Sequence, residues 1–305
     1  MNQQSKKLPK LTIGLPIYNG ESFIRKRLEN ILSESFTDFE LIISDDSMDA
    51  TPSICQEFAN KDKRIHYIHQ KNRMGLVWNF DYLLKQAKSE YFVWAGVDDK
   101  WTPDFLEKNI AILDSNKDVV GSMGKIERYG PPINEYKLDP NDSSTQKIYK
   151  KFRRFFRPFG VFPVMSESYE DRVRTYLKIR DDHGVWAVYR TKKLQKCMEY
   201  DPWNFCLPIV LNVLKYGKLH VFDKVMIYYY TQGTTSEGIL QHWHKGKNKI
   251  RDVIFPWSAF TLWCSKNLGV KVFLKNLDHF ILLQVLGFLS QMMEFVSWFK
   301  NLGSK

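Results

Sequence analysis

The chain has 305 residues, a hydrophobic content of 44% and a formal net charge of +11, with 45 Lys and Arg against 34 Asp and Glu. This length suits one large domain, or one domain with an appendage, and the basic balance favours an anionic partner. The four cysteines form no C-x-x-C pair, which argues against a zinc site or a disulfide framework and fits a reducing compartment. The opening residues MNQQSKKLPK lack an apolar stretch, so we expect no signal peptide.

Apolar strands alternate with amphipathic helices through the first hundred residues. The stretch LTIGLPI predicts a buried strand that runs into a turn at Asn19-Gly20. Strand and helix alternating in this way indicate an α/β fold with a mostly parallel central sheet and helices on both of its faces. The expected strands are 11–17, 39–46, 64–70 and 90–99, and the expected helices are 21–35, 51–62 and 75–89.

Polar or acidic residues stand at the ends of three of these strands. Tyr18-Asn19 follow the first strand, Asp45-Asp46 end the second, and Asp98-Asp99 end the fourth. Ligands bind at the carboxyl ends of the strands in such sheets, so we expect these residues to lie together. Adjacent carboxylates repel each other unless a cation or hydrogen-bond donors lie between them. The sequence therefore predicts a ligand site that includes a cation.

The second half of the chain is less regular. Residues 130–150 are rich in Pro, Asn, Asp and Ser and predict a linker or a loop. A strand is expected at 184–190, a helix at 207–217, and two strands at 218–222 and 225–230. The last sixty residues read as apolar helices.

Three blocks of the first 130 residues resemble family 2 glycosyltransferases, which have the GT-A fold and use nucleotide-diphosphate sugars. The blocks, in order, are LPIYNGESFI, FTDFELIISDDSMDAT and NRMGLVWNFDYLLKQAKSEYFVWAGVDDKWTPDFLEK. The resemblance implies a nucleotide-sugar-binding half at 1–130 and an acceptor-side half at 131–240 in the same domain. A helical, amphipathic extension follows at 241–305.

The resemblance also implies roles for single residues. Tyr18 would stack on the base and Asp46 would accept a hydrogen bond from its N–H edge. Arg73 would lie near the phosphates, Asp98 would face the ribose or the sugar, and Asp99 would hold Mg²⁺ or Mn²⁺. Hard oxygen ligands and a dianionic leaving group agree with such a metal. The nucleotide-sugar-binding residues are expected to be Pro16, Tyr18, Asn19, Asp46, Arg73 and Asp98.

Each of these residues also has a purely structural interpretation. Asp98-Asp99 could cap the helix that TPDFLEK begins, because acids are favoured at helix starts. Asp45-Asp46 could be turn residues, Tyr18 could pack in the core, and Arg73 could be a solvated surface charge.

Two features depart from the family pattern. The acidic loop DDSMDAT is one residue shorter than usual, which leaves the role of Asp49 open. Inverting members use a carboxylate as general base about ten residues before a helix-ending glycine, here Gly217, yet the stretch NFCLPIVLNVLKYG contains no acid. The candidates for the base are Asp201 and Asp182. A non-catalytic nucleotide-sugar-binding or scaffold protein of the same fold is the alternative.

Two segments suggest contacts outside the ligand site. KIYKKFRRFFRPFG carries six Lys or Arg, and its Phe residues fall on one helical face, which suits an anionic membrane surface or a packed core face. In Leu277–Phe299 a polar stripe formed by Gln284, Gly287, Gln291 and Glu294 interrupts an apolar helix. This pattern predicts an interfacial helix or an oligomer contact, with a core helix or a membrane span as alternatives. His242 and His244 are read as surface residues, with metal binding as the alternative.

The sequence thus predicts a metal-dependent, inverting, hexosyl-type glycosyltransferase. A UDP-sugar is the favoured donor, and a glycan or a lipid-linked saccharide is the expected acceptor. We expect a cytoplasmic protein that is peripheral on the cytoplasmic membrane face, with no nucleic-acid partner, and a homo-oligomer formed through the C-terminal helix is considered.

Overall fold

The structure is a computed structural model that describes residues 8–130, 161–179, 182–199, 206–231 and 254–302, with isolated positions between 140 and 151. The chain divides into two compact units. Unit 1 comprises Met1–Glu127, Gly160–Tyr169 and Asp182–Tyr229, and unit 2 comprises Arg128–Phe159, Glu170–Asp181 and Tyr230–Lys305. The division of the chain at residues 130 and 240 stays a prediction.

Unit 1 opens with the predicted alternation of strand and helix. Every residue of β1 except Pro16 is buried, so both faces of the strand are covered, which explains its nearly continuous apolar run. Pro52 lies in the first turn of α2, where its missing N–H costs no hydrogen bond. The elements are β1 (Leu11–Ile17), α1 (Ile24–Leu32), β2 (Phe39–Asp45), α2 (Thr51–Lys61), β3 (Ile65–His69), α3 (Leu76–Gln86) and β4 (Tyr91–Trp94).

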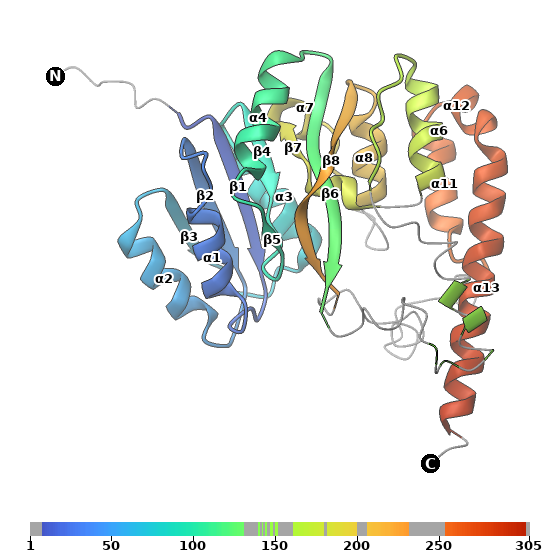
Figure 1. Cartoon of the computed structure of the whole chain (residues 1–305), viewed down its shortest axis with the longest axis horizontal. Coiled ribbons are helices and arrows are strands. Elements are labelled where there is room, and N and C mark those ends of the chain that lie inside the picture. Colours follow the sequence, from blue (N-terminus) through green and yellow to red (C-terminus); the bar gives the residue numbers. More distant parts are fainter. Residues whose placement is uncertain are drawn as a thin grey trace. The chain divides into compact units, whose positions relative to one another are not determined.

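The described strands form one eight-stranded sheet in the order β3-β2-β1-β4-β7-β6-β8-β5 (Figure 1). The β1–β2, β2–β3 and β1–β4 pairs are parallel, which confirms the parallel half of the sheet. The pairs β4–β7, β6–β7 and β5–β8 are antiparallel. After β3 the chain crosses to the far side of β1, so the topological switch point lies between β1 and β4. Right-handed crossovers then place α1 and α2 on one face and α3 on the other.

Several elements differ from the predicted ones. The strand expected at 90–99 ends at Trp94, and β5 (Lys100–Trp101) and β6 (Val119–Tyr129) were not predicted, while α4 (Phe105–Ser115) is the helix that TPDFLEK begins. Residues 218–230 form one strand, β8 (Lys218–Tyr230), because the exposed polar residues at its centre stay in the ladder. The strand expected at 184–190 is a 3₁₀ helix (His183–Trp186) followed by β7 (Val188–Arg190). The remaining helices of unit 1 are α7 (Thr191–Leu194) and α8 (Cys206–Val213).

The last sixty residues contain helices, as predicted, whereas the helix α6 (Tyr169–Ile179) of unit 2 was not predicted. The other described helices of unit 2 are α11 (Ser258–Asn267), α12 (Val270–Lys275) and α13 (Leu277–Leu302). Surface ion pairs join α6 to α12 and α13, for example Arg174 with Asp278 at 2.9 Å and Lys275 with Asp171 at 2.8 Å. Among the described residues, no helix combines the length and the apolar character that crossing a membrane requires.

Three residues of the predicted polar stripe, Gln284, Gly287 and Gln291, face the rest of unit 2, and the side chain of Glu294 lies outside the described ones. Gln284 accepts a hydrogen bond from the Trp257 amide and donates one to the Thr261 hydroxyl, both at 3.1 Å. A Cβ at Gly287 would lie 2.5 Å from Pro256, so only glycine permits this close packing, and Gln291 is 5% exposed. Some apolar side chains of α13 are exposed on other sides, among them Ile281 and Val285.

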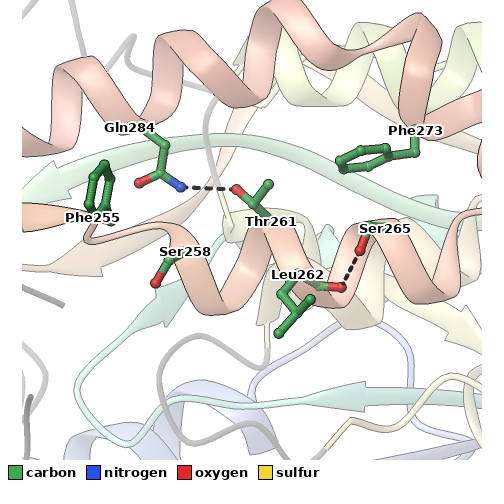
Figure 2. A pocket seen from close by; sticks show the side chains of 7 residues that line it. All are labelled: Phe255, Ser258, Thr261, Leu262, Ser265, Phe273 and Gln284. Atoms are coloured by element: carbon green, nitrogen blue, oxygen red, sulfur yellow. Dashed lines mark hydrogen bonds between the residues drawn. The ribbon is translucent and has the colours of Figure 1, made fainter. Parts of the chain in front are cut away.

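A shallow groove of about 330 Å³ lies between α11 and α13 (Figure 2). Figure 2 shows that Gln284 and Thr261, two of its polar side chains, bond to each other. The groove contains none of the predicted site residues. Its lining residues are Phe255, Ser258, Thr261, Leu262, Ser265, Phe273 and Gln284.

A buried carboxylate joins α1 to α4 within unit 1. Glu34, just past the end of α1, is 3% exposed and accepts a hydrogen bond of 3.0 Å from the backbone N–H of Leu106. Burial raises the pKa of Glu34 to about 7, against the opposing effects of this hydrogen bond and of the Arg27 charge. The folded protein therefore releases this proton at a higher pH than the unfolded chain does.

We predict that Glu34 makes folding stability depend on pH. Because its pKa is higher in the folded state, the stabilisation is complete below about pH 4.5 and is lost as the pH rises through about 7, by up to ~3 kcal/mol. In urea unfolding between pH 5 and 8, E34Q is expected to remove this part of the pH dependence. The control is E57Q, because Glu57 has a pKa lowered to about 2 and does not titrate in this range. Equal slopes for wild type and E34Q would contradict the assignment.

Candidate functional site

The strands β1 and β4 separate at the carboxyl end of the sheet. The pairing of the two strands ends at Gly14 and Trp94, followed by a hydrogen bond from the Ala95 N–H to the Gly14 carbonyl. In a parallel ladder, alternate residues face the same neighbour, so Pro16 faces the β4 side. Proline has no N–H to offer there, and β4 turns away before reaching it. The sequence-predicted residue Pro16 thus lies at the sheet's switch point.

The loops after β1 and β2 are joined by hydrogen bonds. The Asn19 N–H donates to the Ser47 hydroxyl at 2.7 Å, and the Asn19 side-chain oxygen accepts from the Met48 N–H at 3.1 Å. Asn19 has a φ of 52°, a left-handed conformation that asparagine tolerates better than most residues. Asn19 therefore shapes the loop, and its contact with a nucleotide stays a prediction.

Asp49 has a structural role in this pair of loops. Its carboxylate accepts hydrogen bonds from the backbone N–H groups of Thr51 (3.0 Å) and Glu21 (3.2 Å). The Glu21 carboxylate in turn accepts one from the Ala50 N–H at 3.1 Å. The shortened acidic loop thus uses its last acid to hold the two loops together.

Asp46 connects the end of β2 to the start of α3. It is 5% exposed, and its Oδ2 accepts hydrogen bonds from the N–H groups of Met74 (2.9 Å) and Gly75 (3.1 Å) and from the Asn79 amide (3.3 Å). Oδ1 makes no hydrogen bond to any residue that the structure describes. One oxygen thus holds the protein together, and the other can accept from a ligand's N–H group.

Arg73 lies over the ring of Tyr18. The guanidinium carbon is 4.1 Å from the ring centroid, a cation–π contact between two side chains that are not buried. The structure therefore brings these two predicted site residues together. A planar ligand that stacks on this face of Tyr18 would have to displace the guanidinium.

Asp98 and Asp99 lie in the loop between β4 and β5. A Cβ on Gly96 would be 2.4 Å from Asp99 Oδ2 and 3.5 Å from Asp98 Oδ1, so both carboxylates gather over this glycine. Burial raises the pKa of Asp98, and the Arg27 guanidinium acts in the opposite direction. The pair is not a helix cap, because α4 begins at Phe105 and the residue before it is Asp104.

These carboxylates fit a hard divalent cation that a ligand helps to bind. Within the described part of the chain, no group of three or more His, Cys, Asp or Glu side chains is arranged to hold a metal. Mg²⁺ typically takes one or two protein carboxylates and completes its shell with ligand phosphates and water. Asp99, 4% exposed beside Asp98, provides this donor set.

Asp182 also lies near the carboxyl end of β4. β7 runs antiparallel to β4, so the chain that enters β7 comes from that end. The Asp182 side chain is 46% exposed, whereas His183 is buried against the Tyr229 ring. The pKa of the Cys206 thiol at the start of α8 is raised mainly by burial and, to a smaller extent, by the negative charge of Asp182. Asp201, His242 and His244 lie outside the described residues.

Sequence reasoning missed the buried residues behind the acidic pair. Arg27 is 2% exposed, and its guanidinium lies 4.1 Å from the Trp101 ring centroid. Asn30 bonds to both backbone groups of Trp101. One signal was available, since Arg27 falls at the same helical spacing as apolar residues of α1.

The protein-family model described as "Glycosyl transferase family 2" matches residues 12–198. A putative teichuronic acid biosynthesis glycosyltransferase of Bacillus subtilis is 31% identical over 106 residues, which cover 34% of this chain and 42% of that protein. The chain spans a similarly limited part, a third to two fifths, of other curated relatives that it matches.

Solved structures share the fold. TarS 1–349 of S. aureus in complex with UDP-GlcNAc aligns with a TM-score of 0.51 and 20% identity over 79% of this chain and 62% of that one. The mannosyltransferase PcManGT of Pyrobaculum calidifontis, in complex with GDP-Man and Mn²⁺, aligns with a TM-score of 0.53 and 15% identity over 98% and 89%. These likenesses confirm the α/β fold of the GT-A type.

We predict that D46A destabilises the protein more than D46N does. Alanine removes all three hydrogen bonds to Oδ2, one of them to a buried amide, and should lower the free energy of unfolding by ~2–4 kcal/mol. Asparagine keeps a carbonyl oxygen for the two backbone N–H groups and should cost about 1 kcal/mol. Urea unfolding measures both values. Equal stability of the two variants would show that these contacts do not hold α3.

Proposed function

The chain belongs to glycosyltransferase family 2, and we propose that it transfers a hexosyl unit from a UDP-sugar to a glycan or a lipid-linked saccharide, with metal dependence and inversion. The observation that carries this proposal is the gathering of Tyr18, Asp46 and the Asp98-Asp99 pair at the carboxyl ends of β1, β2 and β4. A flat stacking surface, an N–H acceptor and a pair of carboxylates are the features that a nucleoside diphosphate requires.

Each part of the donor has a candidate partner. The base would stack on Tyr18 and donate an N–H to Asp46 Oδ1, the oxygen without a partner in the described chain. Arg73 would leave the Tyr18 ring and move to the phosphates as the base enters. Bound Mg²⁺ or Mn²⁺ would offset the charge that develops on the leaving diphosphate, and Asp99 is the residue proposed to hold it. The Mn²⁺ in the mannosyltransferase of similar fold supports a metal, without deciding between the two ions.

Asp182 is the described candidate for the general base. Its half-exposed carboxylate can meet an acceptor that enters from solvent, near the end of β4 that carries the acidic pair. It would take the proton of the acceptor hydroxyl as the new glycosidic bond forms. Asp201 remains the other candidate. The glycan acceptor draws support from the teichuronic acid relative.

We further propose that the protein is peripheral on the cytoplasmic membrane face and binds through unit 2. The exposed apolar side chains of α12 and α13 follow steps of three and four residues, which place those of each helix along one face. Those that follow these steps are Val270, Leu274, Leu277, Ile281, Val285, Phe288 and Met292, and Leu289 is exposed beside Phe288. A net charge of +11 favours an anionic surface as the partner. A second copy of the chain is the competing partner for this face.

We predict that the protein binds UDP only with Mg²⁺ or Mn²⁺ and that D99A weakens this binding by about two orders of magnitude. Calorimetric titration of UDP, GDP and dTDP, with and without Mn²⁺, measures both effects. The control is D223N, which removes a carboxylate paired with Lys125 on the protein surface. Tight binding to D99A would remove the metal assignment, and binding without sugar transfer would favour the non-catalytic alternative.

We predict that the protein cosediments with phosphatidylcholine–phosphatidylglycerol vesicles and that the double variant I281Q/V285Q binds at least ~10-fold more weakly. L8Q is the matched control, since Leu8 is also exposed but lies outside α12 and α13. Light scattering after gel filtration distinguishes the competing partner. A change of oligomeric mass in I281Q/V285Q without a change in vesicle binding would assign this face to a second copy.

A further inference from the structure

Arg27 is a buried cation behind the acidic pair. It is 2% exposed, lies on α1, and its Nη1 donates a hydrogen bond of 2.7 Å to the Asn30 side-chain oxygen. Its planar guanidinium stacks on the Trp101 ring at 4.1 Å. A buried charge costs free energy unless it is well paired, whereas an apolar side chain could fill this position without that cost.

Asn30 fixes the backbone of Trp101. Its side-chain Oδ1 accepts from the Trp101 N–H at 2.9 Å, and its Nδ2 donates to the Trp101 carbonyl at 3.0 Å. The amide thus binds Trp101 as a neighbouring strand would. The same Oδ1 also receives the Arg27 hydrogen bond, so Arg27 and Asn30 act on Trp101 as one group.

Trp101 is two residues past Asp99, so this contact sets one end of the acidic loop. The other end is set by Val97, which packs against the turn after β1: a Cβ on Gly20 would lie 2.9 Å from its Cγ2. Beyond Trp101, the Ser35 N–H donates to the Pro103 carbonyl at 2.9 Å. The segment that carries both carboxylates is thus held on each side by the α1 region.

We propose that Arg27 and Asn30 are positioning residues for the acidic pair. Through Trp101 they hold Asp98 and Asp99 in the arrangement that binds a metal–nucleotide complex. Arg27 is too deeply buried to touch the donor, and the Asn30 amide is already hydrogen-bonded to Trp101. This inference rests on the proposed donor site. A purely structural role would make the same residues important for stability but not for donor affinity.

The test compares UDP affinity in the presence of Mn²⁺ with melting temperature for the full chain. R27M is expected to weaken binding by at least ~20-fold, and N30A by about 10-fold, within the range of roughly 10- to 100-fold known for residues that orient metal ligands. R27K should recover part of the loss, since it keeps the charge but not the planar stack or the fork geometry. Because the two residues act as one group, R27M/N30A should bind little more weakly than R27M alone.

R190M is the matched control. Arg190 is a half-buried arginine that bonds to the carbonyls of Leu113, Asn116 and Val119, away from the acidic loop. The R190M variant should have a lower melting temperature and a UDP affinity within about twofold of wild type. If R27M and N30A behave like R190M, the inference is wrong. If R27M does not fold, N30A decides, because Asn30 is only half-buried. If wild type binds no nucleotide with Mn²⁺, the donor site itself fails, and this inference fails with it.

Discussion

Asp98 and Asp99 are adjacent carboxylates, the first half-buried and the second almost fully buried, and like charges this close repel each other. The chain leaves the sheet at Trp94 and folds both carboxylates over Gly96. The buried cation Arg27 offsets part of this repulsion at Asp98. In the proposed donor site, a bound divalent cation would offset more of it.

The two sides of the candidate site differ in character. On the β2 side, the loops after β1 and β2 are joined by backbone and side-chain hydrogen bonds, and Asp46 is almost fully buried. Near β7, Asp182 is half-exposed at the start of a short 3₁₀ helix. In the proposed reaction, this arrangement would let the donor bind to a rigid site before the acceptor approaches from solvent.

The apolar pattern of the sequence predicts the buried strands of the parallel half of the sheet. β1 has the expected bounds, and the other strands of the parallel half differ mainly at their ends, because apolar periodicity reports burial directly. The strand at β4 is too long in the prediction, since Ala95 and Val97 are apolar although they lie in the loop. The residues of the ligand site follow from their places after strands, whereas Arg27 and Asn30 do not. Their meaning depends on Trp101, seventy residues away, and no local pattern contains that contact.

The polar stripe of α13 illustrates the same limit. The pattern correctly marks a helix with two unlike faces, but it cannot tell which face is turned inward. The half-buried Gln284 bonds to Trp257 and Thr261, and Gly287 leaves space for Pro256. The inward side of α13 also carries buried apolar side chains, Phe280, Leu283 and Leu286, while other apolar side chains of the same helix, such as Ile281 and Val285, are exposed.

In the proposed donor site, Asp46 would combine base recognition with a structural role in one side chain. Because Oδ2 holds the start of α3 while Oδ1 remains for a ligand, a mutation that changes the hydrogen-bonding character of this position also loosens the scaffold. Evolution toward a different nucleobase would therefore meet a stability barrier at Asp46. Tyr18 and Arg73 have no comparable role in holding the fold together, since they are not buried and contact each other. New base preferences in chains of this design should accumulate at those two positions first, with the acid left in place.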